Sequence, residues 1–559
     1  MIRLMRLSAA LPLLALSNMA SAETRPGETL AAETNRPESS TFAAGEPITL
    51  TFHAEGLPAG ESRRLAVRIK DDAGREVAQV SPVLTADAAG RADYAFAAPR
   101  ARLGYYEVSA ALDDGTTIPE QGTRPAGIIS YAVVPDPATR VDYGPALSRF
   151  GMQGGFNRKV NVMPLLGVRY YITGTHWVTF EAKAPGEFPA ARAAAQAKGK
   201  AWPLRFEDLV APHWGDKPWR VYPLGQVVSS ALPDWARVPG TEGTVCRQFG
   251  ALNAAGAKRL PGFAADYARS FMADHPGLNP RIYQMTWEPA DGWCYNGTAE
   301  QLVQIYRLTY DVIHKIDPNA VIAGPTLYPA PTFTTQISGL WKAGLGKYLD
   351  AYSLHASGWG TPPETHGIPD EMRKQIAEGE RISGRRFKII STEHGTHSAV
   401  LGLRGKAAVD TRVSLILLGE GAMMDTAFYV ADFFDVKQGP KSPSLHTQGF
   451  YWNLRDGEAF GSTKLGPKIS VPVYAAMTKL IDGSVSKGRL KGLAGTQYGY
   501  RFVRGATTID AVWDYGAQSD WPVPAGATVC DWMGNCGATR GASVRLTDAP
   551  VYIIVTGGS

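Results

Sequence analysis

In two segments of the sequence, a run of apolar residues typical of a β-strand is followed by a glutamate. Glu288 lies in the segment 282–289 (Ile-Tyr-Gln-Met-Thr-Trp-Glu-Pro), and Glu393 lies in the segment 388–395 (Lys-Ile-Ile-Ser-Thr-Glu-His-Gly). Two such carboxyl groups in one cleft can cleave a glycosidic bond, because one protonates the leaving oxygen while the other attacks the anomeric carbon or activates water. This chemistry requires a fold that brings both strand ends together.

The chain from about residue 141 to 482 has the pattern of such a fold. The strand candidates are residues 320–325, 348–355, 387–393 and 423–430. A helix between strands is predicted to begin at Thr298, because Gln301 completes a capping box, and to end at residues 317–319 (Asp-Pro-Asn). This alternation predicts an α/β fold of the (β/α)8 barrel type, whose active sites lie at the carboxyl ends of the strands.

Short alternating segments flank this region on both sides. Residues 41–137 carry strand candidates separated by turn signals such as residues 72–74 (Asp-Ala-Gly), which predicts an Ig-like β-sandwich after a polar leader at 23–40. The tail returns to alternating strands and predicts a small C-terminal β-domain. The predicted domains are residues 1–22 (signal peptide), 23–140 (leader and β-sandwich), 141–482 (catalytic barrel) and 483–559 (β-domain).

The first residues have the pattern of a secretory signal peptide. Arg3 and Arg6 flank the start of an apolar stretch at 7–16, and residues 20–22 (Ala-Ser-Ala) fit a small-residue cleavage site. The apolar stretch is too short to span a membrane as a stable helix. We therefore expect an exported protein without a membrane span, located in the periplasm or outside the cell.

Four cysteines in an exported chain predict two disulfides. Cys530 and Cys536 flank a predicted turn, so they form one pair, and Cys246 and Cys294 would form the other. Cys294 lies six residues after Glu288. The second disulfide would therefore brace a loop beside the glutamates.

Composition and motifs argue against several other classes of protein. The net charge of +5 is small for 559 residues and no Lys/Arg-rich run occurs, whereas a nucleic-acid surface needs a clustered basic patch. His394 and His397 have no third ligand nearby, so neither a metal nor another cofactor is expected. No Gly-x-Ser-x-Gly, His-Glu-x-x-His or phosphate-binding glycine motif occurs. A Ser/His/Asp site stays open, because its members can be distant in sequence.

Several short motifs follow one another in a specific order along the chain. They are Leu-Gly-Val at 166–168 followed by Trp177 and Glu181, Trp-Glu-Pro at 287–289, Asp-Ala-Tyr-Ser-Leu-His at 350–355, Thr-Glu-His-Gly at 392–395, Val-Tyr-Ala-Ala at 473–476 and Asp-Trp-Met-Gly-Asn at 531–535. In this order they resemble the clan A glycoside hydrolases, most closely family 39 and its relatives that act on bacterial exopolysaccharides.

The resemblance implies a retaining glycoside hydrolase in which Glu288 is the acid/base and Glu393 is the nucleophile. Their carboxyl groups would then lie about 5–5.5 Å apart, whereas about 6.5–9.5 Å would indicate the alternative, an inverting enzyme. Glu288 must start protonated, so we expect burial and the negative charge of Glu393 to raise its pKa. Glu393 must stay ionised, with the help of hydrogen bonds.

The sequence departs from the family pattern at three positions. Trp287 stands where the family usually has an asparagine that bonds the sugar 2-hydroxyl. Ile172 lies near the place of a family arginine, and Ser357 lies where an aromatic residue is expected two positions after His355. From Trp287 we predict a sugar whose C2 is axial or substituted.

Aromatic and histidine side chains on predicted strand-end loops are candidates for the walls of a sugar-binding cleft. These candidates are His355, Trp287, Trp177, His176, Trp293, Trp359 and Tyr429. Packing in the core is the alternative for the aromatic residues, and a hydrogen bond to a backbone carbonyl is the alternative for His355. The expected partner is a polysaccharide or oligosaccharide, and no oligomeric state is predicted. A non-catalytic polysaccharide-binding protein of the same fold, acting in polymer export or capture, is the alternative function.

Overall fold

The structure is a computed structural model that describes residues 27–557 with internal gaps. The gaps are residues 155, 157–159, 201–203, 206–207, 209, 357–361, 366–367, 436–443, 456–462 and 539–540. The predicted signal peptide, Ser357 and the cleft candidate Trp359 therefore lie outside the described residues.

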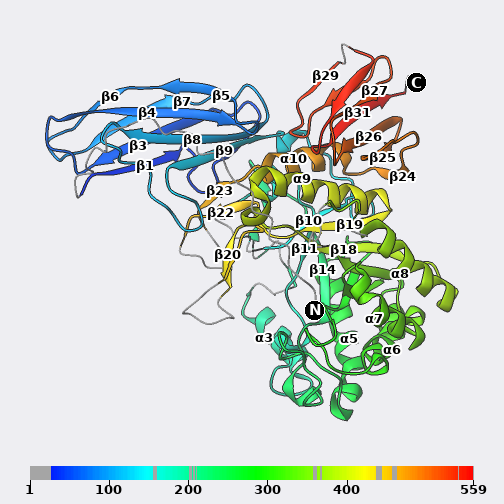
Figure 1. The fold of residues 1–559 in the computed structure, drawn as a ribbon. Coiled ribbons are helices and arrows are strands. Elements are labelled where there is room, and N and C mark those ends of the chain that lie inside the picture. The colour runs from blue at the N-terminus through cyan, green and yellow to red at the C-terminus, as the bar shows by residue number, and fades with distance from the viewer. Residues whose placement is uncertain are drawn as a thin grey trace, which may run out of the picture.

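Eight parallel strands close into a barrel in the lower part of the molecule (Figure 1). In order around the barrel they are β10 (Phe150–Met152), β11 (Tyr170–Ile172), β14 (Tyr222–Ser229), β15 (Ile282–Thr286), β16 (Val321–Leu327), β17 (Ala351–His355), β18 (Lys388–His394) and β19 (Ala422–Ala427). β10 pairs with β19 and completes the ring. Strands such as β14 and β16 are buried along their whole length, as expected where helices cover a parallel sheet. The predicted (β/α)8 fold class is confirmed.

Helices cover the outside of the barrel. The longer ones are α3 (Glu187–Ala197), α5 (Ala254–Asp274), α6 (Ala299–Ile316), α7 (Pro331–Lys342), α8 (Ile368–Ser383), α9 (Ser398–Gly419) and α10 (Ser470–Ile481), and the short ones are α1 (Met163–Leu166), α2 (Trp177–Phe180), η1 (Pro137–Thr139), η2 (Asp234–Ala236) and η3 (Leu345–Tyr348). The capping box that starts α6 is confirmed, because Thr298 and Gln301 each accept the other's backbone N–H. Within the described part of the chain, every helix falls short of the combined length and apolarity needed to cross a bilayer.

An antiparallel β-sandwich precedes the barrel. Its strands are β1 (Thr29–Thr34), β2 (Thr41–Ala43), β3 (Thr49–Glu55), β4 (Ser62–Asp71), β5 (Glu76–Val80), β6 (Val83–Thr85), β7 (Ala92–Ala97), β8 (Gly104–Leu112) and β9 (Ile128–Val134). One sheet has the order β1-β3-β7 and the other the order β2-β9-β8-β4-β5, with β2 and β9 running parallel. Apolar side chains from both sheets, such as Phe52 and Val108, meet in one core.

The expectation that residues 23–40 form only a leader is wrong for part of this range. Residues Thr29–Thr34 form strand β1, which pairs with β3 along its length. Leu30 and Thr34 are the buried residues of β1, the small Ala32 between them packs against the core while partly exposed, and the alternate positions Thr29, Ala31 and Glu33 are exposed. The few apolar residues of this strand explain why its sequence resembles a leader.

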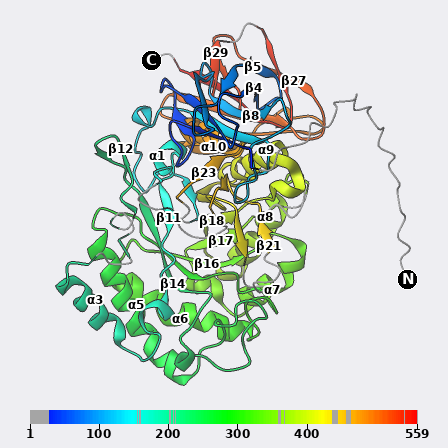
Figure 2. The ribbon, with the colours of Figure 1, turned by 90° about the vertical axis from the view of Figure 1, so that its left-hand side faces the viewer.

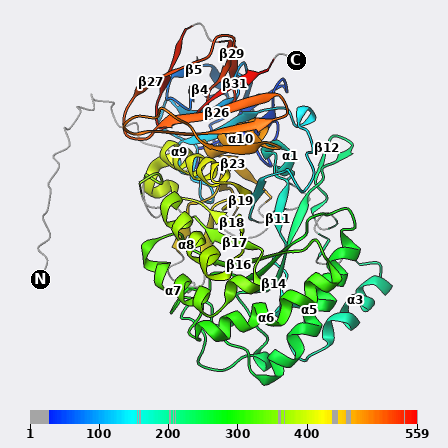
Figure 3. The same ribbon diagram turned by 90° about the vertical axis from the view of Figure 1, so that its right-hand side faces the viewer.

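A second antiparallel unit follows the barrel. Its strands are β24 (Val485–Arg489), β25 (Gln497–Arg504), β26 (Thr507–Asp514), β27 (Ser519–Pro522), β28 (Thr528–Cys530), β29 (Cys536–Ala538), β30 (Ser543–Leu546) and β31 (Val551–Thr556). Six of them form one sheet, and β27 and β30 form a separate pair. Figures 2 and 3 show this unit and the N-terminal sandwich on the same side of the barrel, beyond α9 and α10.

The two flanking β units contact each other and the barrel helices. Tyr105 of the sandwich, Trp532 of the C-terminal unit and Val473 of α10 belong to one buried apolar cluster. The cluster also includes Trp452 of β22 (Tyr451–Asn453), which pairs with β23 (Leu465–Pro467) in a loop beyond the barrel. The described loops contain two further hairpins, formed by β12 (His213–Trp214) with β13 (Lys217–Pro218) and by β20 (Phe433–Asp435) with β21 (Ser444–His446).

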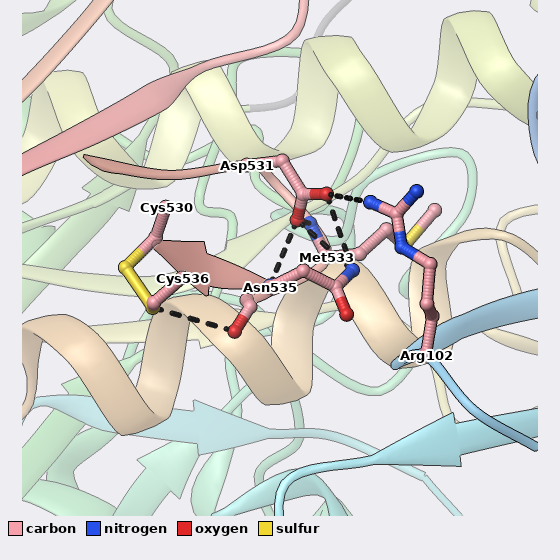
Figure 4. The surroundings of a disulfide bond; sticks show 7 residues. Arg102, Cys530, Asp531, Met533, Asn535 and Cys536 are labelled. Carbon is pink, nitrogen blue, oxygen red and sulfur yellow. Dashed lines mark hydrogen bonds and ion pairs between the residues drawn. A yellow bond between two sulfur atoms is a disulfide. The ribbon is translucent and has the colours of Figure 1, made fainter. Parts of the chain in front are cut away.

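A turn closed by a disulfide provides the polar contacts between the C-terminal β unit and the N-terminal sandwich. Cys530 and Cys536 form the predicted bond at the base of the turn between β28 and β29. Inside the turn, Asp531 accepts a hydrogen bond from Arg102 of the sandwich at 3.0 Å (Figure 4). The side chain of Asn535 both donates to and accepts from the backbone of Leu103, at 2.9 and 3.0 Å. The turn therefore joins the two β units directly.

Candidate active site

Glu288 and Glu393 lie at the same mouth of the barrel. Glu393 is near the end of β18, and Glu288 comes two residues after the end of β15. The backbone of Glu288 has a φ of 47°, in the left-handed region that residues other than glycine rarely adopt. Such backbone strain is concentrated at functional sites, where the surrounding structure holds it in place.

His355 connects the two carboxyl groups. Its Nδ1 is 2.8 Å from Glu288 Oε1 and 3.8 Å from Glu393 Oε2. One polar atom from each of the three residues lies within 4.8 Å of the others, so a pair of carboxyl oxygens is no more than this distance apart. The imidazole is completely buried, and its Nε2 is 3.1 Å from the hydroxyl of Thr392. The alternative of a histidine that bonds only a backbone carbonyl does not apply.

Glu288 accepts hydrogen bonds from three side chains. Besides His355, the hydroxyl of Tyr328 donates to Oε1 at 2.7 Å, and the indole N–H of Trp293 donates to Oε2 at 3.4 Å. Tyr328 follows the end of β16, so strands β15, β16 and β17 all contribute to this carboxylate. Each donor favours the ionised form of Glu288.

Glu393 has fewer donors. The side-chain amide of Gln153, which follows β10, donates to Glu393 Oε2 at 3.2 Å and to the carbonyl oxygen of Thr392 at 2.8 Å. The second bond fixes the position of the amide, so its orientation toward the carboxyl group is defined. Glu393 therefore depends on one amide donor and on the nearby His355 to offset its burial.

The pKa values of the two glutamates are shifted in the directions opposite to those expected from the sequence. Burial acts to raise the pKa of Glu288, but the hydrogen bond and charge of His355, with the bonds from Tyr328 and Trp293, outweigh it and lower that pKa. Burial raises the pKa of Glu393 to about 7, and the negative charge of Glu288 adds to this. When the pair holds one proton, both shifts favour an ionised Glu288 and a protonated Glu393.

Two predicted wall residues lie beside the carboxyl pair. The ring of Trp287 packs edge-to-face against His355, with ring centroids 4.6 Å apart. Trp293 is 48% exposed although its N–H contacts Glu288. A half-exposed indole whose N–H contacts the carboxylate of Glu288 presents an apolar face beside the carboxyl pair.

Other predicted wall residues have different environments. Trp177 is completely buried, stacks on Phe263 and donates to the carboxylate of Glu181, so its prediction as a cleft wall is wrong. Tyr429 is also nearly buried, and its pKa is raised by burial and by the charge of Glu393, which indicates that it lies near that carboxylate. His176 is half-buried before α2, and its part in binding stays a prediction.

Sequence reasoning missed Tyr328 and Gln153. Both immediately follow barrel strands, Tyr328 after β16 and Gln153 after β10. The position directly after each strand is where barrel enzymes place functional side chains, so a scan of these positions would have found both. Thr392 belongs to the motif Thr-Glu-His-Gly, and the structure places its hydroxyl 3.1 Å from Nε2 of His355.

The cysteine pairing predicted for this region is confirmed. Cys246 and Cys294 form a disulfide that closes a loop of 48 residues. Trp293 precedes Cys294 directly, and the backbone of Trp293 accepts a hydrogen bond from the N–H of Val245 at 2.9 Å. The disulfide therefore fixes the segment that carries the exposed indole.

The carboxyl pair and His355 are also groups that bind divalent cations. Their ligand atoms converge within 4.8 Å, whereas His394 bonds Asp425 at 3.0 Å and Ser414 at 2.9 Å. His394 and His397 therefore do not share a site. Because Nδ1 of His355 already donates to Glu288, a cation bound to the converging group would have to displace that hydrogen bond.

Comparison with known proteins agrees with the fold. No protein-family model matches the chain, and no curated protein matches it. The solved structures that it resembles include a family 39 glycoside hydrolase from Bacteroides cellulosilyticus WH2, at 16% identity over 94% of this chain and 100% of that chain, with a TM-score of 0.57. The chain thus shares the fold of that protein, in agreement with the order of motifs in the sequence.

Two further solved structures have lower scores. A family 30 endoxylanase from Clostridium papyrosolvens C71 is 10% identical over 74% of this chain and 97% of that chain, with a TM-score of 0.46. The β-glucuronidase 2 of Bacteroides uniformis is 10% identical over 94% of this chain and 58% of that chain, with a TM-score of 0.37. At these scores the two likenesses add nothing to the likeness with the family 39 structure.

Proposed function

We propose that the protein is an exported retaining glycoside hydrolase that cleaves a polysaccharide or oligosaccharide. The observation that carries this proposal is the pair Glu288 and Glu393, with carboxyl oxygens within 4.8 Å of each other at the mouth of the barrel. This short separation agrees better with the roughly 5–5.5 Å between the carboxyl groups of retaining enzymes than with the roughly 6.5–9.5 Å of inverting enzymes.

Glu288 is the acid/base and Glu393 is the nucleophile in this proposal. Glu393 attacks the anomeric carbon while Glu288 donates a proton to the leaving oxygen, which forms a covalent glycosyl-enzyme and releases the first product. Glu288, now ionised, then takes a proton from water. The resulting hydroxide equivalent attacks the anomeric carbon, and Glu393 leaves as a carboxylate.

The proton must move from Glu393 to Glu288 before the first step. The reacting sugar acquires positive charge in an oxocarbenium-like transition state, which favours an ionised carboxylate beneath the anomeric carbon. Because His355 Nδ1 is 2.8 Å from one carboxylate and 3.8 Å from the other, it is placed to stabilise either charge. Tyr328 and Trp293 hold Glu288 at the position of the leaving oxygen.

The aromatic residues define the kind of substrate. Trp287 places an indole beside His355 where the family that the sequence resembles has an asparagine that bonds the sugar 2-hydroxyl. An indole has one N–H donor and no acceptor, so it cannot replace both roles of the amide. The reacting sugar therefore has an axial or substituted C2. Trp293 stacks on a neighbouring sugar, and this use of an exposed ring fits a polymeric substrate.

The two disulfides support the part of the proposal that concerns export. Both disulfides persist in an oxidising compartment and not in a reducing cytosol. The substrate is therefore a glycan met in the periplasm or outside the cell.

A hydrolysis assay on a glycan panel tests the proposal. The wild type, Glu393→Gln and Glu288→Gln are compared with Glu76→Gln, which changes an exposed glutamate of β5 far from the barrel mouth. Release of sugar by the wild type and the control variant, and its loss in both site variants, is the expected result. A wild type that binds a glycan without cleaving it would overturn the proposal in favour of a polysaccharide-binding protein.

A further inference from the structure

A small cavity lies at the opposite end of the barrel from the carboxyl pair. Arg169 immediately precedes β11 and Trp219 precedes β14, so the cavity is at the amino ends of these strands. The other walls come from the segment after the sandwich (Arg140), from the end of α10 (Lys479) and from the C-terminal sheet (Arg504). Figure 3 shows α1 and α10 close together in this region.

The cavity has room for a small ligand. Its volume is about 60 Å³. A single water requires about 10–15 Å³ of such space, so a group of several non-hydrogen atoms fits.

The charges around the cavity are unbalanced. Four cationic side chains line it, those of Arg140, Arg169, Lys479 and Arg504, against one carboxylate, that of Asp482. Among the described residues, none of the four cations forms a salt bridge within 4.0 Å. Arg169 is buried and the other three cations are partly buried. Asp142 acts on Arg169 and Asp136 acts on Lys479 without forming an ion pair with either, so the negative charge in contact with the group is smaller than its positive charge.

The hydrogen bonds of these cations go to neutral acceptors. Arg140 donates to the carbonyl oxygen of Ala475 at 2.8 Å and to the hydroxyl of Thr478 at 3.0 Å, and its Nε is buried without a partner among the described residues. Arg169 donates to the carbonyl oxygen of Arg220 at 2.9 Å, and its guanidinium lies 3.6 Å from the centroid of the Trp219 ring.

The other two cations are held in the same way. Arg504 donates to the carbonyl oxygen of Asp482 at 2.6 Å, and Lys479 donates to the hydroxyl of Thr139 at 3.0 Å. Carbonyl and hydroxyl groups position the cations and do not neutralise them.

The electrostatics of the group agree with this description. The pKa of Arg140 is lowered to about 9, mainly by burial and also by the charge of Arg169, although Asp482 acts in the other direction. Burial also lowers the pKa of Lys479, with contributions from Arg140 and Arg504. The cations thus repel one another across the cavity, and a bound anion would remove the repulsion.

We propose that this cavity binds a small free oxyanion of the phosphate or sulfate class. Guanidinium groups bind tetrahedral oxyanions through paired N–H donors, and a lysine adds a point charge. The anion would connect four parts of the chain that are distant in sequence: the segment after the sandwich, the base of the barrel, α10 and the C-terminal sheet. Its role is to fix the flanking β units on the barrel, and this does not depend on the reaction proposed above.

Equilibrium dialysis of the full chain against radiolabelled inorganic phosphate tests the proposal directly. The expected result is saturable binding of one phosphate per chain, with competition by sulfate and none by chloride at equal ionic strength. Calorimetric melting should show a matching saturable rise in Tm, because a ligand that binds only the folded state stabilises it. Linear, non-saturable binding would overturn the proposal.

Variants locate the site. In Lys479→Gln with Arg504→Gln we expect phosphate affinity to fall at least tenfold, and the single variant Lys479→Gln serves if the double variant fails to fold. The matched control is Arg501→Gln on the same strand as Arg504, because Arg501 pairs with Asp510 and does not line the cavity. Equal affinity in the wild type, the control and the cavity variants would also overturn the proposal.

Discussion

Replacing Glu393 by glutamine is expected to stabilise the folded chain at pH 8 while it abolishes turnover. Burial raises the pKa of Glu393 to about 7, from 4.5 for an ordinary glutamate. At pH 8 the carboxylate is ionised in the folded and the unfolded chain, so the folded chain carries the whole cost of the raised pKa. A difference of about 2.5 in pKa, at about 1.4 kcal/mol per pKa unit, corresponds to roughly 3 kcal/mol.

The expected gain in the free energy of unfolding increases as the pH rises. The folded chain holds this proton more tightly than the unfolded chain, so the cost is absent well below pH 4.5, grows between pH 4.5 and about 7, and is constant above. Glutamine is neutral at every pH and keeps an oxygen that can accept from Gln153. The variant should therefore gain roughly 3 kcal/mol at pH 8 and less than about 1 kcal/mol at pH 5.

Scanning calorimetry of the wild type, Glu393→Gln and the exposed control Glu76→Gln measures this difference. The barrel transition of Glu393→Gln should melt several degrees above that of the wild type at pH 8, and the two should converge toward pH 5. The control should follow the wild type at both pH values. A Tm difference that is independent of pH, or a variant that is less stable at pH 8, would refute the assignment of the raised pKa to Glu393.

Three further predictions concern the site. The value of kcat/KM should follow a bell-shaped curve against pH, because the pair of glutamates must hold one proton. The value falls as pH rises through about 7, where Glu393 loses that proton, and it falls again below pH 4.5, where Glu288 gains a second proton. A flat profile across pH 7 would contradict this prediction. Tyr328→Phe removes a donor to Glu288, which should move the acidic limb to higher pH and lower kcat/KM about 10–100-fold, and an unchanged limb would show that the hydroxyl does not set this pKa. Replacing Cys246 and Cys294 by serine opens a 48-residue loop, which should lower the free energy of unfolding by about 4 kcal/mol in denaturant melts and raise KM, whereas unchanged melting would contradict a bracing role.

The barrel and its carboxyl pair were predictable from the sequence because their signals are local. The apolar segments that lead to Glu288 and Glu393, and the capping box at Thr298, each occupy a few neighbouring residues. Strand β1 was missed because its inward face carries one large apolar residue, Leu30, beside the small Ala32 and the polar Thr34. A strand with so few apolar positions has the composition of a polar leader.

The environment of the site was harder to predict because it depends on contacts between distant residues. Trp177 and Trp293 both follow barrel strands, yet one is completely buried and the other is 48% exposed. The hydrogen bond from Tyr328 to Glu288 joins residues 40 positions apart, and that from Gln153 to Glu393 joins residues 240 apart. The contact from Tyr328 helps to lower the pKa of Glu288, and the contact from Gln153 only partly offsets the rise that burial causes for Glu393. No local pattern in the sequence contains these contacts.

The stereochemistry of the first-formed sugar tests the central claim most directly. With carboxyl oxygens within 4.8 Å, the account predicts that wild-type cleavage of the glycan identified in the panel releases a sugar with the same anomeric configuration as the bond that was cut. Proton NMR within the first minutes of reaction, before mutarotation, records this configuration. A first product with inverted configuration would contradict the double-displacement mechanism and the roles of Glu288 and Glu393.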